Sequence, residues 1–106
     1  MTHKELHNRM RTLFNECLSI AATKNSDYAG HEDPFRNLRN CETLGLCTTE
    51  TGIVVRMSDK LARIANLVCK NKPPVVKNES HKDSLLDLAN YAILLAVYLE
   101  ELRPPK

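Results

Sequence analysis

The sequence predicts an all-α protein with a three-helix core and one short extra helix in the first connection. In three long segments, apolar residues recur every three or four positions, as on one side of a helix. The alternation typical of strands is absent, except at Val75-Val76. Only five of the 106 residues are Phe or Tyr and none is Trp, so the core is expected to be aliphatic. A chain of this length fits one domain, residues 1–106.

The first helix is expected at about residues 3–23. Thr2 and Glu5 form a T-x-x-E capping box at its start. Apolar residues follow at helical spacing, namely Leu6, Met10, Leu13, Phe14, Cys17 and Ala21. A polar segment then leads to Asp33-Pro34, where Asp33 is expected to cap a short helix that begins at Pro34 and ends at Gly45.

Two longer helices are expected at about residues 48–70 and 79–102. A threonine at 48–49 caps the first of them, and Lys72-Pro73-Pro74 ends it. Its core-facing stripe is predicted to consist of Val54, Met57, Leu61, Ile64 and Val68. Asn78 or Ser80 caps the last helix, which is apolar nearly all round from Tyr91 to Leu99. A helix apolar on every side is buried or paired with another chain, so we expect a homo-oligomer.

Charge and cysteine content narrow the class of protein. With 15 basic and 13 acidic residues the net charge is +2, which does not indicate a general nucleic-acid or membrane binder. The apolar run Tyr91–Leu99 is too short to span a bilayer, and the polar N-terminus does not resemble a secretory signal. The four cysteines form no C-x-x-C pair, so we interpret them as reduced thiols of a cytoplasmic protein.

Two polar stripes on the last two helices carry the candidate site. The first consists of Arg56, Asp59, Lys60, Arg63 and Asn66, and the second of Glu79, Asp83, Asp87 and Asn90. Carboxylates beside guanidinium groups suit Mg²⁺ and a phosphorylated ligand. We therefore predict Asp59, Glu79 and Asp83 as metal ligands, and Arg56, Lys60 and Arg63 as phosphate-binding residues.

Structural alternatives exist for the acidic stripe. Glu79 lies in a first helical turn, where the helix dipole favours an acid, and Asp83 could close a capping box with Ser80. Asp87 is expected to pair with Arg56 or Arg63, or to contact the ligand. The basic stripe could also be a solvated face held by ion pairs along the helix.

The first connection adds two candidate ligand contacts. Tyr28 could stack on a ligand base, and Asn37 follows the Pro34-Phe35 pair. The alternative for the aromatic residues Tyr28 and Phe35 is that they anchor the core within ordinary turns.

Together these motifs resemble a known family over roughly residues 20–95. They are Lys24-Asn25-x-Asp27-Tyr28, Pro34-Phe35-x-Asn37, Gly52-x-x-x-Arg56-x-x-Asp59-Lys60-x-x-Arg63-x-x-Asn66-Leu67 and Glu79-Ser80-x-x-Asp83-x-x-x-Asp87-Leu88-Ala89-x-Tyr91. The pattern is similar to the small phage and prophage proteins called nucleotide modification associated domain proteins. The resemblance implies a role in nucleotide metabolism, in the bacterial host cytoplasm if the chain is phage-encoded.

A more distant resemblance is to the all-α MazG-like nucleoside triphosphate pyrophosphohydrolases, which place E-x-x-E and E-x-x-D on successive helices around Mg²⁺. Here the first pair is missing, and Glu79-x-x-x-Asp83 is one residue longer than the second. Two functions follow as expectations. One is Mg²⁺-dependent hydrolysis of a nucleoside triphosphate at its α–β bond. The other is a non-catalytic sponge that sequesters a nucleotide immune signal.

Overall fold

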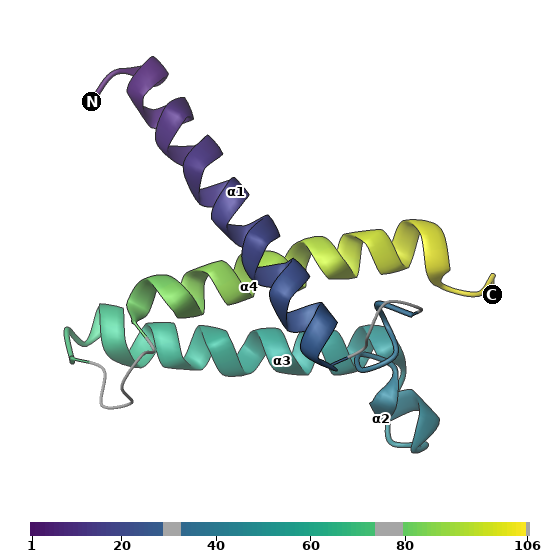
Figure 1. Cartoon of the computed structure of the whole chain (residues 1–106). Helices are drawn as coiled ribbons and strands as arrows, with labels where there is room; N and C mark the ends of the chain where they lie inside the picture. The colour runs from purple at the N-terminus through teal and green to yellow at the C-terminus, as the bar shows by residue number, and fades with distance from the viewer. Residues whose placement is uncertain (29–32, 74–79, 106) are drawn as a thin grey trace.

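The computed structural model describes residues 1–28, 33–73 and 80–105, without the side chains of residues 25–28. These ranges contain helices α1 (His3–Tyr28), α2 (Asn40–Thr43), α3 (Thr49–Ile64) and α4 (His81–Val97) (Figure 1). A π-helical turn extends α3 as η1 (Ala65–Cys69), and another extends α4 as η2 (Tyr98–Leu102). Two long helical rods therefore follow the short helix α2.

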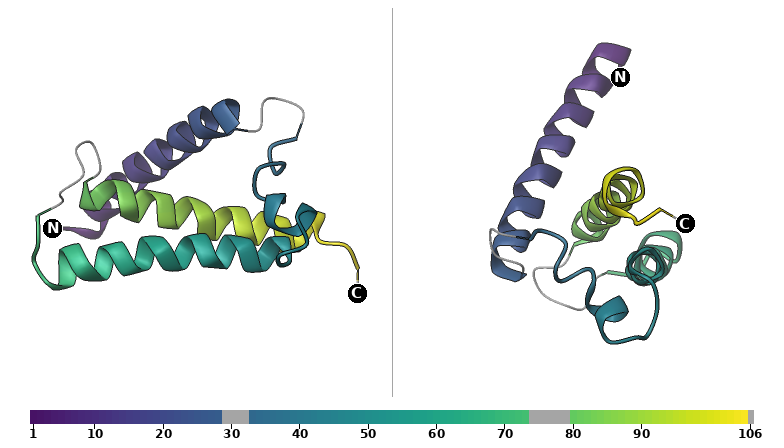
Figure 2. Two further views of the ribbon diagram at one scale, coloured as in Figure 1. Left: turned by 90° about the horizontal axis from the view of Figure 1, so that it is seen from below. Right: turned by 90° about the vertical axis from the view of Figure 1, so that its right-hand side faces the viewer.

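Helices α3 and α4 lie side by side and antiparallel, while α1 crosses α4 obliquely (Figure 2). The C-terminal half of α1 contacts α4, whereas its N-terminal half extends beyond the α3–α4 pair. The Cα radius of gyration is 15.6 Å. A compact domain of this length has a value of about 13 Å. The difference reflects the projecting half of α1.

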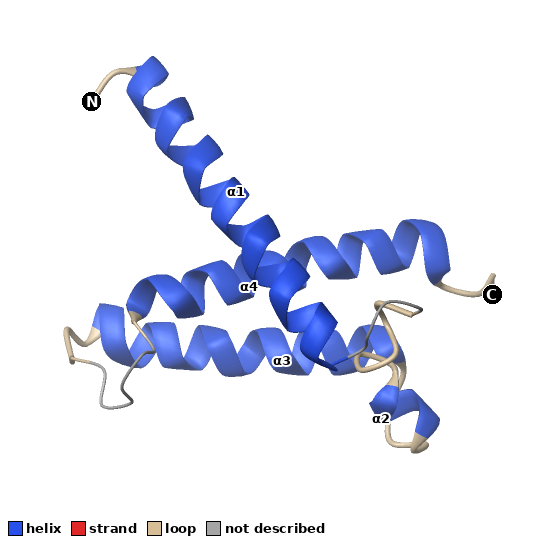
Figure 3. Cartoon of the chain, in the orientation of Figure 1, coloured by secondary structure: helices blue, strands red, loops and turns tan. Residues whose placement is uncertain are grey.

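The all-α prediction is confirmed, since every regular element within the described ranges is helical (Figure 3). The first helix runs to Tyr28, five residues further than expected. The short helix is confined to Asn40–Thr43, because residues 34–39 form turns instead. Asp33 is therefore not the N-cap of α2, whose N-cap residue is Arg39. The Asp33 Oδ1 accepts a hydrogen bond from the Phe35 amide at 3.0 Å within these turns. Gly45 follows α2 with a φ of 75°, a left-handed conformation that favours glycine.

Three of the helix N-caps predicted from local sequence are present. Thr2 and Glu5 exchange reciprocal backbone-to-side-chain hydrogen bonds of 3.1 Å. Thr48 accepts a hydrogen bond from the Thr51 amide at the start of α3. Ser80 and Asp83 form a complete capping box at the start of α4, while Asn78 lies outside the described residues.

The buried core joins the first connection to the two antiparallel helices. Its central members are Phe35 and Leu38 from residues 33–39, Ile53 from α3 and Tyr98 from η2. The Phe35 and Tyr98 rings are tilted at 37° with centroids 6.2 Å apart, an arrangement typical of stabilising aromatic pairs. Met57, Tyr91, Leu94 and Leu95 pack around this cluster. The structure therefore anchors the segment after α1 against the far end of α4.

The predicted core-facing stripe of α3 is partly wrong. Val54, Leu61 and Val68 are 50%, 58% and 48% exposed, whereas Ile53 is completely buried and Leu67 nearly so. The packed side of α3 is thus rotated by about one residue from the predicted stripe. Gly52, next to Ile53, is buried as well, and it packs against the Cys41 side chain.

None of the four cysteines forms a disulfide. Cys17 is buried where α1 meets α4, and its Sγ lies 3.9 Å from the carbonyl oxygen of Leu86. The other three are half-buried or exposed.

Candidate functional site

A pocket of about 700 Å³ opens between α1, α3, α4 and the segment that precedes α2. Its described lining is mainly apolar but includes several charged and polar side chains. The lining consists of Leu18, Ala21, Ala22, Lys24, Pro34, Asn37, Leu38, Arg56, Lys60, Asp87, Asn90, Tyr91 and Leu94. A volume of this size accommodates one small organic ligand.

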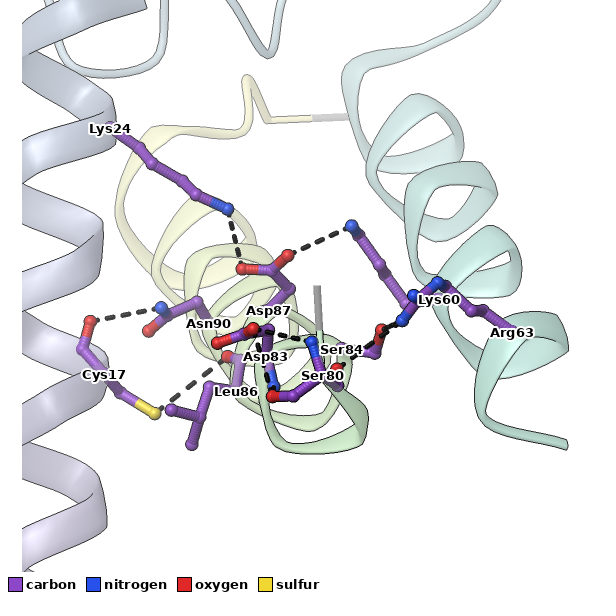
Figure 4. Close-up of polar contacts among 10 residues, drawn as sticks. All are labelled: Cys17, Lys24, Lys60, Arg63, Ser80, Asp83, Ser84, Leu86, Asp87 and Asn90. Atoms are coloured by element: carbon purple, nitrogen blue, oxygen red, sulfur yellow. Dashed lines mark hydrogen bonds and ion pairs between the residues drawn. The ribbon is translucent and has the colours of Figure 1, made fainter. Parts of the chain in front are cut away.

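The pocket lining contains three positive side chains and one carboxylate, and two of the three cations contact that carboxylate. Lys24 comes from α1, Arg56 and Lys60 come from α3, and Asp87 comes from α4. Lys24 Nζ lies 2.7 Å from Asp87 Oδ1, and Lys60 Nζ lies 3.0 Å from Asp87 Oδ2 (Figure 4). The Asp87 carboxylate therefore bridges α1 to α3 through two ion pairs, and the described lining carries a net charge of +2.

Asp87 is held in its charged form by this arrangement. Its side chain is only 12% exposed, and burial by itself raises the pKa of a carboxyl group. The hydrogen bonds and positive charges of Lys24 and Lys60 outweigh burial, so the pKa of Asp87 lies below its ordinary value. The bridge is therefore intact throughout the neutral pH range.

Two asparagines and one arginine fix the edges of the pocket. Asn90 Nδ2 donates a hydrogen bond of 3.1 Å to the carbonyl oxygen of Cys17, which ties α4 to α1 (Figure 4). Arg56 Nη2 donates to the carbonyl oxygen of Asn37 at 3.4 Å, which ties α3 to the segment before α2. These hydrogen bonds hold the elements that line the pocket together.

The structure gathers four of the nine predicted site residues at this pocket, namely Arg56, Lys60, Asp87 and Asn37. The expected pairing of Asp87 with an arginine is wrong, because its carboxylate pairs with two lysines. The side chain of Tyr28 and the whole of Glu79 lie outside the described part of the chain.

Three predicted residues lie elsewhere. Arg63 Nη1 donates to Ser84 Oγ at 2.7 Å and to the Ser80 carbonyl oxygen at 3.5 Å, so it holds the start of α4 against α3. The Asp83 carboxylate accepts hydrogen bonds from the Ser80 amide and hydroxyl at 2.8 and 3.0 Å, as the capping alternative predicts. Asp59 is exposed on α3, outside the lining.

Sequence reasoning missed the contribution of α1. Lys24, Leu18 and the paired alanines Ala21 and Ala22 line the pocket, although α1 carries none of the predicted site residues except Tyr28. Lys24 is the first residue of the motif Lys24-Asn25-x-Asp27-Tyr28. This motif could have pointed to Lys24 as a site residue.

The described residues do not assemble an obvious metal centre. In residues 1–24, 33–73 and 80–105, no three His, Cys, Asp or Glu side chains converge where an ion could be held. Glu79, the third residue of the predicted Mg²⁺ set, falls in the gap between these ranges.

Comparison of the chain with protein-family models, with curated proteins and with solved structures found no match. Among the helices of the described residues, none has the length and apolar character needed to cross a membrane. The function is therefore inferred from the residues of the pocket.

Replacing Asp83 with asparagine is expected to lower the free energy of unfolding by about 0.5 kcal/mol at pH 7, because it keeps an acceptor oxygen at the cap but removes the negative charge that a helix N-terminus favours. Hydrogen bonds from Ser80 hold the pKa of Asp83 below its ordinary value. Its stabilising effect is therefore present above the unfolded-state pKa of about 3.9 and is lost as pH falls through the lower folded-state pKa.

Urea denaturation of the wild type and of Asp83→Asn, at pH 7 and near pH 2.5, measures this effect. We expect the difference between the two proteins to shrink in acid. Ser80→Ala serves as the matched variant, since it removes the hydroxyl side of the same cap. An equal deficit at both pH values in Asp83→Asn would contradict the assignment.

Proposed function

We propose that this protein binds a phosphorylated nucleotide in the pocket between α1, α3 and α4. The observation that supports this most is that Lys24, Arg56 and Lys60 line the same pocket as several apolar side chains. Ammonium and guanidinium groups form strong charge-assisted hydrogen bonds with phosphate oxygens. A ligand with an anionic end and a flat, weakly polar end complements both the cationic and the apolar side chains of the pocket.

The remaining lining residues suit a nucleobase. Leu38, Tyr91 and Leu94 provide apolar and aromatic surface, and Asn37 and Asn90 place amide groups beside it. Ligand sites commonly combine such walls with a few placed polar groups that fix orientation.

The test is incubation of the purified protein with a panel of nucleotides, with and without Mg²⁺, followed by chromatography and calorimetry. Retention of an intact nucleotide supports the proposal, and so does retention combined with turnover. If no nucleotide of the panel is bound under either condition, the proposal is wrong.

Hydrolysis of a nucleoside triphosphate at the α–β bond is the second candidate. The observation in its favour is the Asp87 carboxylate on the pocket wall, because Mg²⁺ typically takes one or two carboxylates together with phosphate oxygens. Both Asp87 oxygens contact lysines, so a metal ion would have to replace these ion pairs. In that case Asp59, Glu79 and Asp83 would be tested as further ligands, and a nucleoside monophosphate would appear only when Mg²⁺ is present.

Binding without turnover would favour the other role that the family resemblance implies. In that role the protein is an anti-defence sponge that sequesters a nucleotide immune signal in the host cytoplasm. The three cations in the pocket lining support retention of an anionic ligand.

We also propose that the protein forms a homo-oligomer. Val54 and Leu61 on α3 and Val68 on η1 recur every seven residues, so they lie on about the same side of this continuous helix, and all three are exposed. Such a stripe is costly to leave in water. Light scattering at micromolar concentration is expected to give at least a dimer, and Leu61→Lys is expected to weaken it. A monomeric wild type would contradict the proposal.

A further inference from the structure

We infer that the pocket selects a nucleotide with a single phosphate group, and that Asp87 sets this selectivity. The inference rests on the proposed nucleotide-binding function and adds the class of ligand. It depends on the position of one carboxylate within a cluster of cations.

The charge balance of the pocket is the first part of the argument. Lys24, Arg56 and Lys60 supply three positive charges to the described lining and Asp87 removes one, which leaves +2. A phosphomonoester carries a charge of about −1.5 to −2 at neutral pH. One phosphate group therefore neutralises the pocket, whereas each further phosphate adds negative charge that the described lining does not balance.

The geometry around Asp87 is the second part. Its two oxygens contact Lys24 and Lys60 on either side, at 2.7 and 3.0 Å, and these are cations that a bound phosphate would also contact. A lysine ammonium has three donors, so it can serve the carboxylate and one phosphate together. A longer phosphate chain brings more negative oxygens close to Asp87.

The burial of Asp87 is the third part. Its side chain is 12% exposed, so water and salt screen its charge only weakly. Repulsion between like charges is stronger there than at an open surface. The lowered pKa of Asp87 means that the carboxylate stays negative at neutral pH and maintains this repulsion.

The test measures affinity for the 5′-mono-, di- and triphosphates of adenosine, guanosine, cytidine and thymidine by calorimetry, in EDTA and at fixed salt. For the wild type we expect monophosphates to bind more tightly than triphosphates of the same nucleoside. In Asp87→Asn the ratio of triphosphate to monophosphate affinity is expected to rise about tenfold or more, as for gain of one charge-assisted interaction. Asp87→Glu is expected to keep the wild-type ratio.

Glu16→Gln is the matched control. Glu16 also joins α1 to α4, through an ion pair of 2.8 Å with Lys82, but it does not line the pocket. The substitution makes the same change of charge and breaks an ion pair between the same two helices. It is expected to leave the ratio unchanged.

Circular dichroism would reveal whether Asp87→Asn folds. If it does not, a second variant tests the same inference. Leu18 is exposed and lines the pocket, so Leu18→Lys adds a positive charge without removing a buried group. It is also expected to shift the preference toward triphosphates.

The outcomes separate the two proposals. If the wild type binds triphosphates as tightly as monophosphates or more tightly, the inference is overturned while nucleotide binding stands. A folded Asp87→Asn protein with the wild-type ratio also overturns it, and an unshifted Leu18→Lys does so if Asp87→Asn does not fold. If the wild type binds no nucleotide at all, the proposed function fails and this inference fails with it.

Discussion

Replacing Ile53 with alanine is expected to lower the free energy of unfolding by about 2–5 kcal/mol. Ile53 is completely buried at the centre of the core cluster, between the segment before α2 and the end of α4. The substitution removes apolar contacts and leaves a cavity that the surrounding aromatic rings cannot fill completely. Because domains of this kind have about 5–15 kcal/mol of stability, such a loss is a large fraction of the total.

Urea denaturation followed by circular dichroism measures this effect. Val55→Ala is the control, since Val55 lies two residues away on the same helix and is half exposed. Its effect is expected to remain within about 0.5 kcal/mol. Similar losses in the two variants would show that the core is not centred on Ile53.

Replacing Arg56 with alanine is expected to weaken nucleotide binding by roughly tenfold or more. Arg56 lines the pocket, and charge-assisted hydrogen bonds of this kind contribute about 1.5–3 kcal/mol. The substitution also removes the hydrogen bond from Arg56 to the Asn37 carbonyl oxygen, so part of the loss reflects a less ordered pocket edge. Arg56→Lys is expected to recover part of the affinity, because it restores the charge without the planar fork.

Arg63→Ala provides the contrast seven residues further along α3. Arg63 contacts Ser80 and Ser84 and does not line the pocket. We expect this variant to have a lower melting temperature and an almost unchanged nucleotide affinity, measured by calorimetry below the melting transition. Unchanged binding in Arg56→Ala would refute the placement of the site, and weakened binding in Arg63→Ala alone would move it toward the start of α4.

Features determined by neighbouring residues could be predicted from the sequence. The caps at Thr2, Thr48 and Ser80 depend on side chains within three residues of the backbone groups they satisfy. The existence of the three long helices likewise follows from periodicity along each segment. The fold class was therefore predictable without knowledge of tertiary contacts.

The side of α3 that packs against the core was not predictable in the same way. Apolar residues occur on two sides of this helix, and the choice between Ile53 and Val54 depends on where α4 and residues 33–39 lie. Periodicity gives the spacing of a stripe but does not reveal its partner. The same limit applies to the Lys24–Asp87 ion pair, whose members are 63 residues apart.

For the candidate site, the polar stripes predicted Arg56, Lys60 and Asp87 but also included Arg63 and Asp83. All five lie at helical spacing, so the sequence alone does not show which of them line the pocket. In the structure, Arg63 and Asp83 contact residues at the start of α4, and the other three line the pocket. The positions of α1 and of the segment before α2 separate the two groups.

Because α1 packs obliquely, a small rotation at its contact with α4 would move its N-terminal end by a larger distance. Its contacts with α4 begin near Cys17, and the residues before that point extend past the bundle. From His3 to Cys17 the helix measures about 21 Å, at a rise of about 1.5 Å per residue. A rotation of about 10° at the Cys17 contact would therefore displace the N-terminal end by about 4 Å. A small adjustment of the pocket wall around a ligand would be magnified into a movement that a spin label or fluorophore near His3 can report.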